Sequence, residues 1–201
     1  MSYRIAALDI ETASLKVRTA ILEVGLVVID IQEPDAYENI EFLEDKAMKF
    51  NFVLPLPEQL LLGKHVDPNT LRFHLNNIRK SDPTYEFGHT IFPIEVAPRS
   101  SLRKVVSDLQ AHIAELEVKE LWVNHTSFDC SRLISLAEDL GIEKPLWGYR
   151  IERDLATIRT LVPKEHRDEP HTVAHRGTED AMWNLRELSR VMSLLKPKGM
   201  P

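Results

Sequence analysis

The sequence has too few cysteines to cross-link itself. Cys130 is the single cysteine among 201 residues, so no internal disulfide can form. A chain of this length with 43% hydrophobic residues can bury a substantial core without one. The cysteine count is typical of a reducing compartment, so we expect a cytoplasmic protein, with Cys130 as a buried thiol.

Long apolar runs and a leader-like N-terminus are also missing. No run approaches the roughly 20 apolar residues of a membrane-spanning helix, and Asp9 interrupts the only candidate for a signal segment. We find no internal repeat, no low-complexity segment and no break in composition that requires a second domain. We therefore expect no membrane partner and one domain over 1–201, structured over about 3–195, with a frayed tail at 196–201.

The sequence also lacks an excess of positive charge. Its net charge of −6 argues against a protein that coats nucleic acid by bulk attraction. The charge is uneven, because residues 30–45 hold seven acids and no base, whereas bases cluster later in the chain, at Arg150, Arg153, Arg159, Lys164 and Arg167. Bound metal ions can supply local positive charge, so an acidic metal-dependent enzyme can still bind phosphates.

The hydrophobic pattern predicts strands first, then alternating helices and strands, which together describe an α/β domain with a mixed sheet covered by helices. We predict an antiparallel meander of three strands, at 3–8, 20–31 and 48–54. Two shorter strands are predicted at 120–124 and 146–151. Helices are predicted at 67–76, 100–117, 127–140, 154–161 and 178–195.

Turn and cap signals complete the predicted order of elements. Asp67 and Ser127 are predicted as N-caps, and Gly141 is predicted to end the helix over 127–140. We expect a solvated turn over 30–45, a loop over 79–98 and a mobile loop over 165–176. The three tryptophans are expected in the core, at Trp122, Trp147 and Trp183.

Two carboxylates end the first predicted strand. Asp9 and Glu11 are spaced i, i+2, so on a strand they point to the same face. At about 4 Å and an effective dielectric of about 20, two such charges repel by about 4 kcal/mol. Oxygen ligands this close suit Mg²⁺ or Mn²⁺. An acid-x-acid triplet is expected about once by chance in a chain of this length, so the spacing alone favours two surface acids.

Two further acids occur where helices are predicted to begin, and the same sheet would place them near Asp9. Asp129 ends the segment 124–129, and Asp180 follows His175 by five residues. Taken singly, each could be an ordinary acid in a first helical turn, stabilised by the helix dipole by about 0.3–1 kcal/mol.

Together these segments resemble the DEDDh family of 3′→5′ exonucleases. Its three motifs are matched in order by Asp9-Ile-Glu11-Thr12, Asn124-x-x-x-Phe128-Asp129 and His175-x-x-x-x-Asp180-Ala181. The segment 21–25 (ILEVG) is similar to the usual second strand of the family. The resemblance implies a ribonuclease-H-like, mixed five-stranded sheet flanked by helices, with the acids grouped at one edge. Ser14 stands where relatives often carry Gly, and residues 36–98 follow no family pattern.

The resemblance also implies roles for individual residues. Two Mg²⁺ or Mn²⁺ ions would be held by four carboxylates, those of Asp9, Glu11, Asp129 and Asp180, and His175 would be the general base. Substrate contacts are implied at four further positions, for which packing or capping is an equal alternative: Thr12, Leu15, Asn124 and Phe128. The implied reaction removes nucleoside 5′-monophosphates from the 3′ end of single-stranded DNA or RNA. That 3′ end is the expected partner, and a homodimer is compatible with the sequence.

Other interpretations stay open. An inactive ribonuclease-H-like binding or scaffold domain usually lacks one or more of the carboxylates, whereas all four and the histidine are present here. The sequence does not separate a polymer exonuclease from a phosphodiesterase for short oligonucleotides. His171 and His175 have the i, i+4 spacing of a zinc pair, but Pro170 and Gly177 disfavour the helix that such a pair requires.

Overall fold

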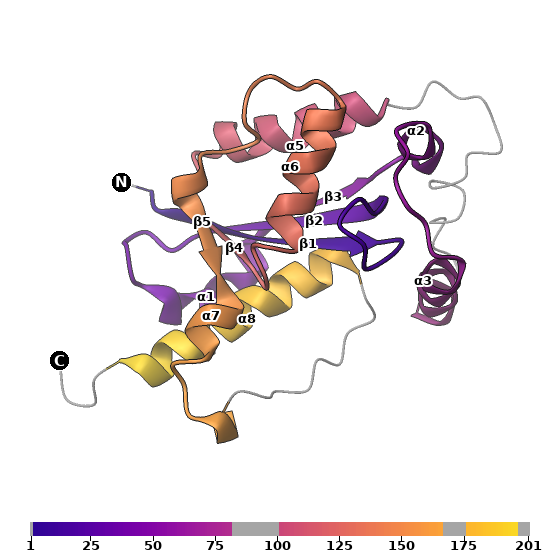
Figure 1. Ribbon diagram of the computed structural model, residues 1–201. Helices are drawn as coiled ribbons and strands as arrows, with labels where there is room; N and C mark the ends of the chain where they lie inside the picture. Colours follow the sequence, from indigo (N-terminus) through magenta and orange to yellow (C-terminus); the bar gives the residue numbers. More distant parts are fainter. Residues whose placement is uncertain (1, 82–100, 167–175, 197–201) are drawn as a thin grey trace.

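The computed structural model describes residues 2–81, 101–166 and 176–196 (Figure 1). Its centre is one sheet in the order β3-β2-β1-β4-β5. The strands are β1 (Arg4–Thr12), β2 (Ile21–Asp30), β3 (Met48–Val53), β4 (Glu120–Val123) and β5 (Glu152–Asp154). The first three pair antiparallel, and β4 and β5 add parallel strands beside β1. Both the meander and the mixed five-stranded sheet are therefore confirmed.

Helices cover both faces of this sheet (Figure 1). On one face lie α5 (Leu102–Glu115) and α6 (Asp129–Asp139), and on the other lie α1 (Ile40–Leu43), α7 (Leu155–Arg159) and α8 (Gly177–Leu195). Two further helices, α2 (Leu56–Leu61) and α3 (Pro68–Ser81), lie beyond the end of β1. None of the helices in the described part of the chain is long and apolar enough to cross a membrane.

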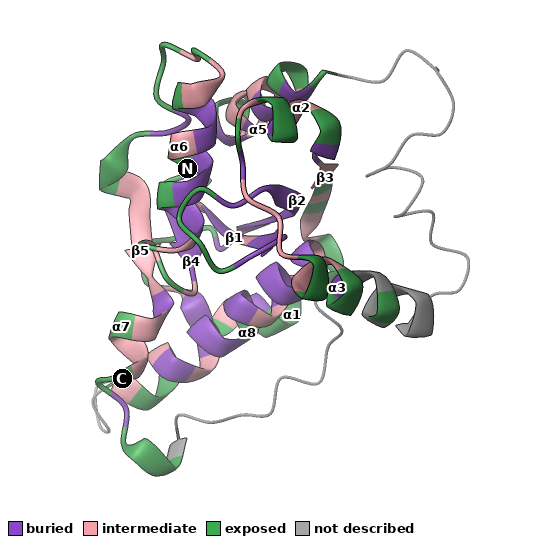
Figure 2. Cartoon of the chain, turned by 45° about the vertical axis from the view of Figure 1, so that its right-hand side comes forward, coloured by how far each residue is buried: buried purple, intermediate pink, exposed green. Residues whose placement is uncertain are grey.

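The central strand β1 alternates between two hydrophobic cores because successive side chains of a strand point to opposite faces. Ala6, Leu8 and Ile10 pack with α5 and α6, whereas Ile5 and Ala7 pack with α8. Figure 2 shows the central strands and much of α8 as buried. This alternation decides which face the residues that follow Leu8 occupy.

Most of the predicted elements are confirmed within a few residues. Asp67 caps α3, since its Oδ1 accepts hydrogen bonds from the backbone N–H of Asn69 and Thr70 at 2.8 and 2.9 Å. Gly141 follows α6 with a φ of +64°, a conformation that glycine adopts without strain. Cys130 is buried as expected, and so are Trp122 and Trp147, whereas Trp183 is half-buried.

The prediction of a solvated turn over 30–45 is wrong. This stretch contains a 3₁₀ helix, Tyr37–Asn39, followed by α1 and a second 3₁₀ helix, Glu44–Lys46. Tyr37 and Ile40 are buried in the core beneath α8. The acids point outward, where Glu44 pairs with Arg186 and Glu38 with Lys196. The apolar side chains of this acidic segment therefore dock it against the core.

Four local predictions also differ from the structure. Residues 146–151 form no strand, because Leu146 and Trp147 both enter the core and β5 begins only at Glu152. The residue before α6 is Phe128 rather than Ser127, and no side chain caps that helix.

The other two differences concern the helices beyond the end of β1. No helix was predicted over 56–61, yet α2 forms there, with Pro55 before it and Pro57 in its first turn, where Pro is favoured. The helix α3 continues to Ser81, so 79–81 are not loop, while 82–98 lie outside the described residues. Most of the predicted loop 165–176 and the tail beyond Lys196 also lie outside them, and the single-domain assignment stays a prediction.

Candidate active site

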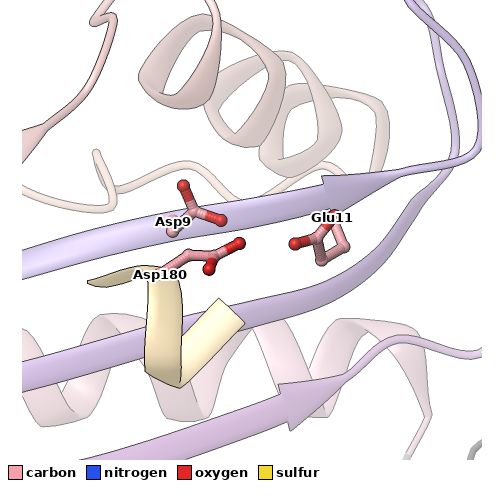
Figure 3. A group of neighbouring side chains, drawn as sticks. All are labelled: Asp9, Glu11 and Asp180. Atoms are coloured by element: carbon pink, nitrogen blue, oxygen red, sulfur yellow. The ribbon is translucent and has the colours of Figure 1, made fainter. Parts of the chain in front are cut away.

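Three carboxylates meet at the C-terminal end of β1. Asp9 and Glu11 come from β1 and Asp180 from the first turn of α8, and one oxygen of each lies within 4.8 Å of the others. Figure 3 shows the three side chains directed toward a common centre. Glu11 and Asp180 are buried, and Asp9 is half-buried. Such a group of hard oxygen donors suits a divalent cation.

The strand period sets the direction of the first two acids. β1 continues through the motif as far as Thr12, so Asp9 and Glu11 fall in the series that begins with Ile5 and Ala7 and faces α8. The sequence-based prediction that both acids share one face is consistent with this geometry. We expected the strand to end at Leu8, before both acids. It instead continues to Thr12, because its pairing with β2 extends over the whole segment.

The third acid is placed by a contact between two glycines. A Cβ on Gly25 would lie 1.8 Å from the carbonyl carbon of Gly177, and a Cβ on Gly177 would lie 2.5 Å from the backbone nitrogen of Gly25. No other residue type fits at either position without a backbone shift. Oε1 of Glu23 also accepts a hydrogen bond from the backbone N–H of Gly177 at 3.1 Å. Since Gly25 is the β2 partner of Asp9, these contacts hold the start of α8 against the site.

Asp129 lies beside this group but is not one of its three members. It begins α6, is buried, and its Oδ2 accepts a hydrogen bond from the backbone N–H of His125 at 3.3 Å. Its charge reaches the group, because it raises the pKa of both Asp9 and Glu11. The four acids predicted from the sequence therefore divide into a cluster of three and a neighbour.

Burial is the main cause of the electrostatic character of the site. It raises the pKa of Asp9 well above its ordinary value, with the charges of Asp129 and Glu11 adding to the effect. Burial, Asp180 and Glu23 together raise the pKa of Glu11 to about 9. Burial also raises the pKa of Asp129 and of Glu23 to about 7. Bringing so many carboxyls out of water favours their protonation or the binding of a metal ion among them.

A cavity of about 300 Å³ opens over the acids. Of the four predicted substrate-contact residues, Thr12, Leu15 and Phe128 line it. The side chain of Leu15 is 82% exposed, which is unusual for a leucine beside buried acids. Asn124 does not line the cavity, and its Oδ1 instead accepts a hydrogen bond from Nη2 of Arg159 at 3.5 Å. His171 and His175 lie outside the described residues.

Sequence analysis missed the contribution of α3. Thr70, Phe73 and His74 line the same cavity, and Nδ1 of the buried His74 lies 3.4 Å from Oε2 of Glu11. Phe73 is 46% exposed. Their i, i+3, i+4 spacing marks one helical face, which is the only signal in the sequence that could have grouped them. Nothing local indicated that this face meets β1.

The sheet order and the flanking helices define the class of the protein as a ribonuclease-H-like α/β fold, and the family match confirms its resemblance to the DEDDh exonucleases. A family model described as the 3′-5′ exoribonuclease Rv2179c-like domain matches residues 5–192, and the chain belongs to this family. A search of curated protein sequences finds no match.

The fold is shared with a solved nuclease. The structure is similar to the crystal structure of cell-death related nuclease 4 (CRN-4), with a TM-score of 0.50 and 13% sequence identity. The match covers 96% of this chain but 64% of that one, so the chain spans about two thirds of the nuclease's length. At this identity the comparison establishes the fold.

The glycine contact can be tested by adding one methyl group. Gly25→Ala should destabilise the protein by about 1–3 kcal/mol or more, because the new Cβ meets backbone atoms that cannot rotate away. Thermal or urea unfolding measures the change. Gly148→Ala is the matched control, since a Cβ there meets nothing within 4 Å, and it should stay within about 0.5 kcal/mol of wild type. Equal stability of the two variants would contradict a close contact between β2 and α8.

The carboxyls predict that metal-free protein loses stability as the pH rises. Their folded pKa values lie above the ordinary 3.8 of Asp and 4.5 of Glu, so the folded state binds more protons than the unfolded chain. The stability from these protons is complete below about pH 4 and is lost as the pH rises toward about 9. We expect the melting temperature without divalent ions to fall across this range, and Asp180→Asn to raise it at pH 8 by removing one of the crowded charges.

The control for this experiment is Asp45→Asn, an exposed acid outside the site. It should leave the pH dependence as in wild type. Millimolar Mn²⁺ should stabilise wild type at pH 8 by mass action, and Asp180→Asn much less. A wild-type melting temperature that is unchanged by both pH and Mn²⁺ would contradict a shared carboxylate site.

Proposed function

We propose that this protein is a divalent-metal-dependent 3′→5′ exonuclease that shortens single-stranded RNA and releases nucleoside 5′-monophosphates. The observation that carries the proposal is the cluster of Asp9, Glu11 and Asp180 at the base of a cavity with an apolar mouth. The activity for which the family is named, exoribonuclease, favours RNA over DNA. An inactive scaffold domain is disfavoured, because all four carboxylates are present and three of them converge.

The residues fit Mg²⁺ or Mn²⁺ as cofactors. The donors are carboxylate oxygens, which these ions prefer, and a bound cation would offset the burial and mutual repulsion that raise the pKa values of Asp9 and Glu11. Asp9, Glu11 and Asp180 would hold one ion, and Asp129 with Asp9 a second. When bound, the ions would lower the pKa of the attacking water and offset the charge that develops on the phosphate.

The remaining chemistry falls to side chains of the protein. His175 would accept the proton of the attacking water, a role suited to a side chain whose pKa lies near neutrality. In the sequence it stands two residues before Gly177, whose backbone is fixed against Gly25.

Recognition of a chain end is assigned to the cavity walls. Leu15, Phe128 and Phe73 would contact the terminal bases, since stacking and apolar contacts with bases are worth about 1–3 kcal/mol each and tolerate any sequence. Thr12 is buried beside Glu11, and its hydroxyl donates to the carbonyl oxygen of Ser14 at 2.9 Å. Its backbone is assigned to the 3′-hydroxyl.

A second candidate, a phosphodiesterase for short oligonucleotides, is favoured by one observation. The residues that line the cavity include no Lys or Arg in the described part of the chain. A long strand is usually held by cationic contacts along its phosphates, so short RNA of a few nucleotides is a plausible substrate. A series of RNA lengths from two to about 20 nucleotides distinguishes the two, because a short-substrate enzyme loses kcat/KM as the strand lengthens.

Kinetics should separate the general base from the metal ligands. His175→Ala should lower turnover about 10²–10⁴-fold, the usual contribution of a positioned proton acceptor, and should retain stabilisation by Mn²⁺. Asp9→Ala should abolish both activity and that stabilisation. Steady-state rates with Mn²⁺, paired with melting curves, measure the two effects. Loss of Mn²⁺ stabilisation in His175→Ala would make the histidine a ligand and restore the zinc interpretation.

The proposed recognition of a chain end determines the direction of cleavage. A 5′-labelled single-stranded RNA should shorten one nucleotide at a time from its 3′ end, whereas a covalently closed circle of the same sequence should resist. A 3′-phosphate should slow the reaction, because it adds negative charge beside the carboxylates. Gel analysis of both substrates, with DNA of the same sequence in parallel, provides the measurement. Rapid nicking of circles, or products that carry 3′-phosphates, would indicate an endonuclease instead.

A further inference from the structure

A buried arginine connects two walls of the cavity. Arg132 lies on α6 and is only 7% exposed. Its Nη1 donates to the carbonyl oxygen of Phe128, and its Nη2 donates to the carbonyl oxygen of Leu15, both at 3.0 Å. Its Cζ also lies 3.6 Å from the centroid of the Phe128 ring, in a cation–π contact. One side chain thus contacts both apolar residues that the resemblance implies as substrate contacts.

The cost of burying a guanidinium indicates that this arrangement has a specific role. Removing such a charge from water is unfavourable unless its donors are used, and burial lowers the pKa of Arg132. Both hydrogen bonds go to backbone carbonyls at the rim of the cavity. The planar fork of an arginine can hold two acceptors at a fixed separation, which a lysine cannot do.

The two residues that Arg132 contacts come from distant parts of the chain. Leu15 lies in the connection between β1 and β2 and is separated from Arg132 by 117 positions. Its side chain is 82% exposed, so packing does not fix its position. Phe128 directly precedes α6. Both line the cavity over the acids.

We propose that Arg132 is a positioning residue that fixes Leu15 and Phe128 at the separation needed to hold the 3′-terminal nucleotide. The inference rests on the proposed function and deepens it, because it assigns substrate affinity to a residue outside the three motifs. Walls that are fixed before the substrate arrives do not have to be ordered on binding, which lowers KM. The charge of Arg132 also lowers the pKa of Asp129, which burial raises, so kcat should change least in a variant that keeps the positive charge.

The experiment measures KM and kcat for a short 5′-labelled single-stranded RNA with Mn²⁺, together with melting temperatures. Arg132→Met keeps the length of the stem but removes both hydrogen bonds and the charge, and it should raise KM roughly tenfold. Arg132→Lys retains the charge but can serve only one of the two carbonyls, so its KM should lie between those of wild type and Arg132→Met while its kcat changes less than about twofold. Arg103→Met is the matched control, because Arg103 is exposed and donates to the carbonyl of Leu140, away from the cavity.

A double-mutant cycle separates positioning from stability. Leu15→Ala should raise KM by a similar factor. The KM of the double variant, Arg132→Met with Leu15→Ala, should be within about twofold of that of the worse single variant, because both changes act on the same contact between Leu15 and the substrate. Independent, multiplying effects on KM, or a variant that melts lower with unchanged KM, would overturn the proposal. If Leu15→Ala and Phe128→Ala both leave KM unchanged, the proposed substrate contacts themselves are wrong.

Discussion

The carboxylate site at the end of β1 depends on the close approach of two backbones, at Gly25 in β2 and Gly177 at the start of α8. A methyl group on either residue would overlap with the other segment. The contact brings the first turn of α8 to β1, so that Asp180 meets Asp9 and Glu11, and the hydrogen bond from Gly177 to Glu23 fixes the same junction. Close packing of this kind is rigid, and it converts a helix–sheet interface into a defined arrangement of carboxylates.

That arrangement opposes the stability of the fold. Several carboxyls are removed from water and placed beside one another, which raises their pKa values and favours protonation or metal binding over the bare charges. The two cores on either side of the sheet offset this cost, since β1 and β2 bury apolar side chains along almost their whole length. Functional sites commonly retain such unfavourable features because the chemistry requires them.

The cavity is assembled from segments that are distant in the sequence. β1 and α8 supply the acids, the connection after β1 supplies Leu15, and α3 and α6 supply the aromatic walls. Arg132 joins two of these segments, and His74 brings α3 to Glu11. A nuclease with 13% identity shares the fold, and a shared fold does not by itself determine the substrate of a site.

The sequence alone determined the elements whose signals are local. The i, i+2 spacing of Asp9 and Glu11, the apolar run of β2, the cap at Asp67 and the helical periods of α5, α6 and α8 follow from the strand and helix repeats. Only the tertiary structure decided the placement of Tyr37 and Ile40 in a core, the late start of β5 and the separation of Asp129 from the other three acids. It also decided the entry of α3 into the cavity wall and the contact of Arg132 with Leu15. Periodicity assigns a side chain to a face of its own element, but it does not state which other element covers that face, because that choice is made by packing between residues far apart in the chain.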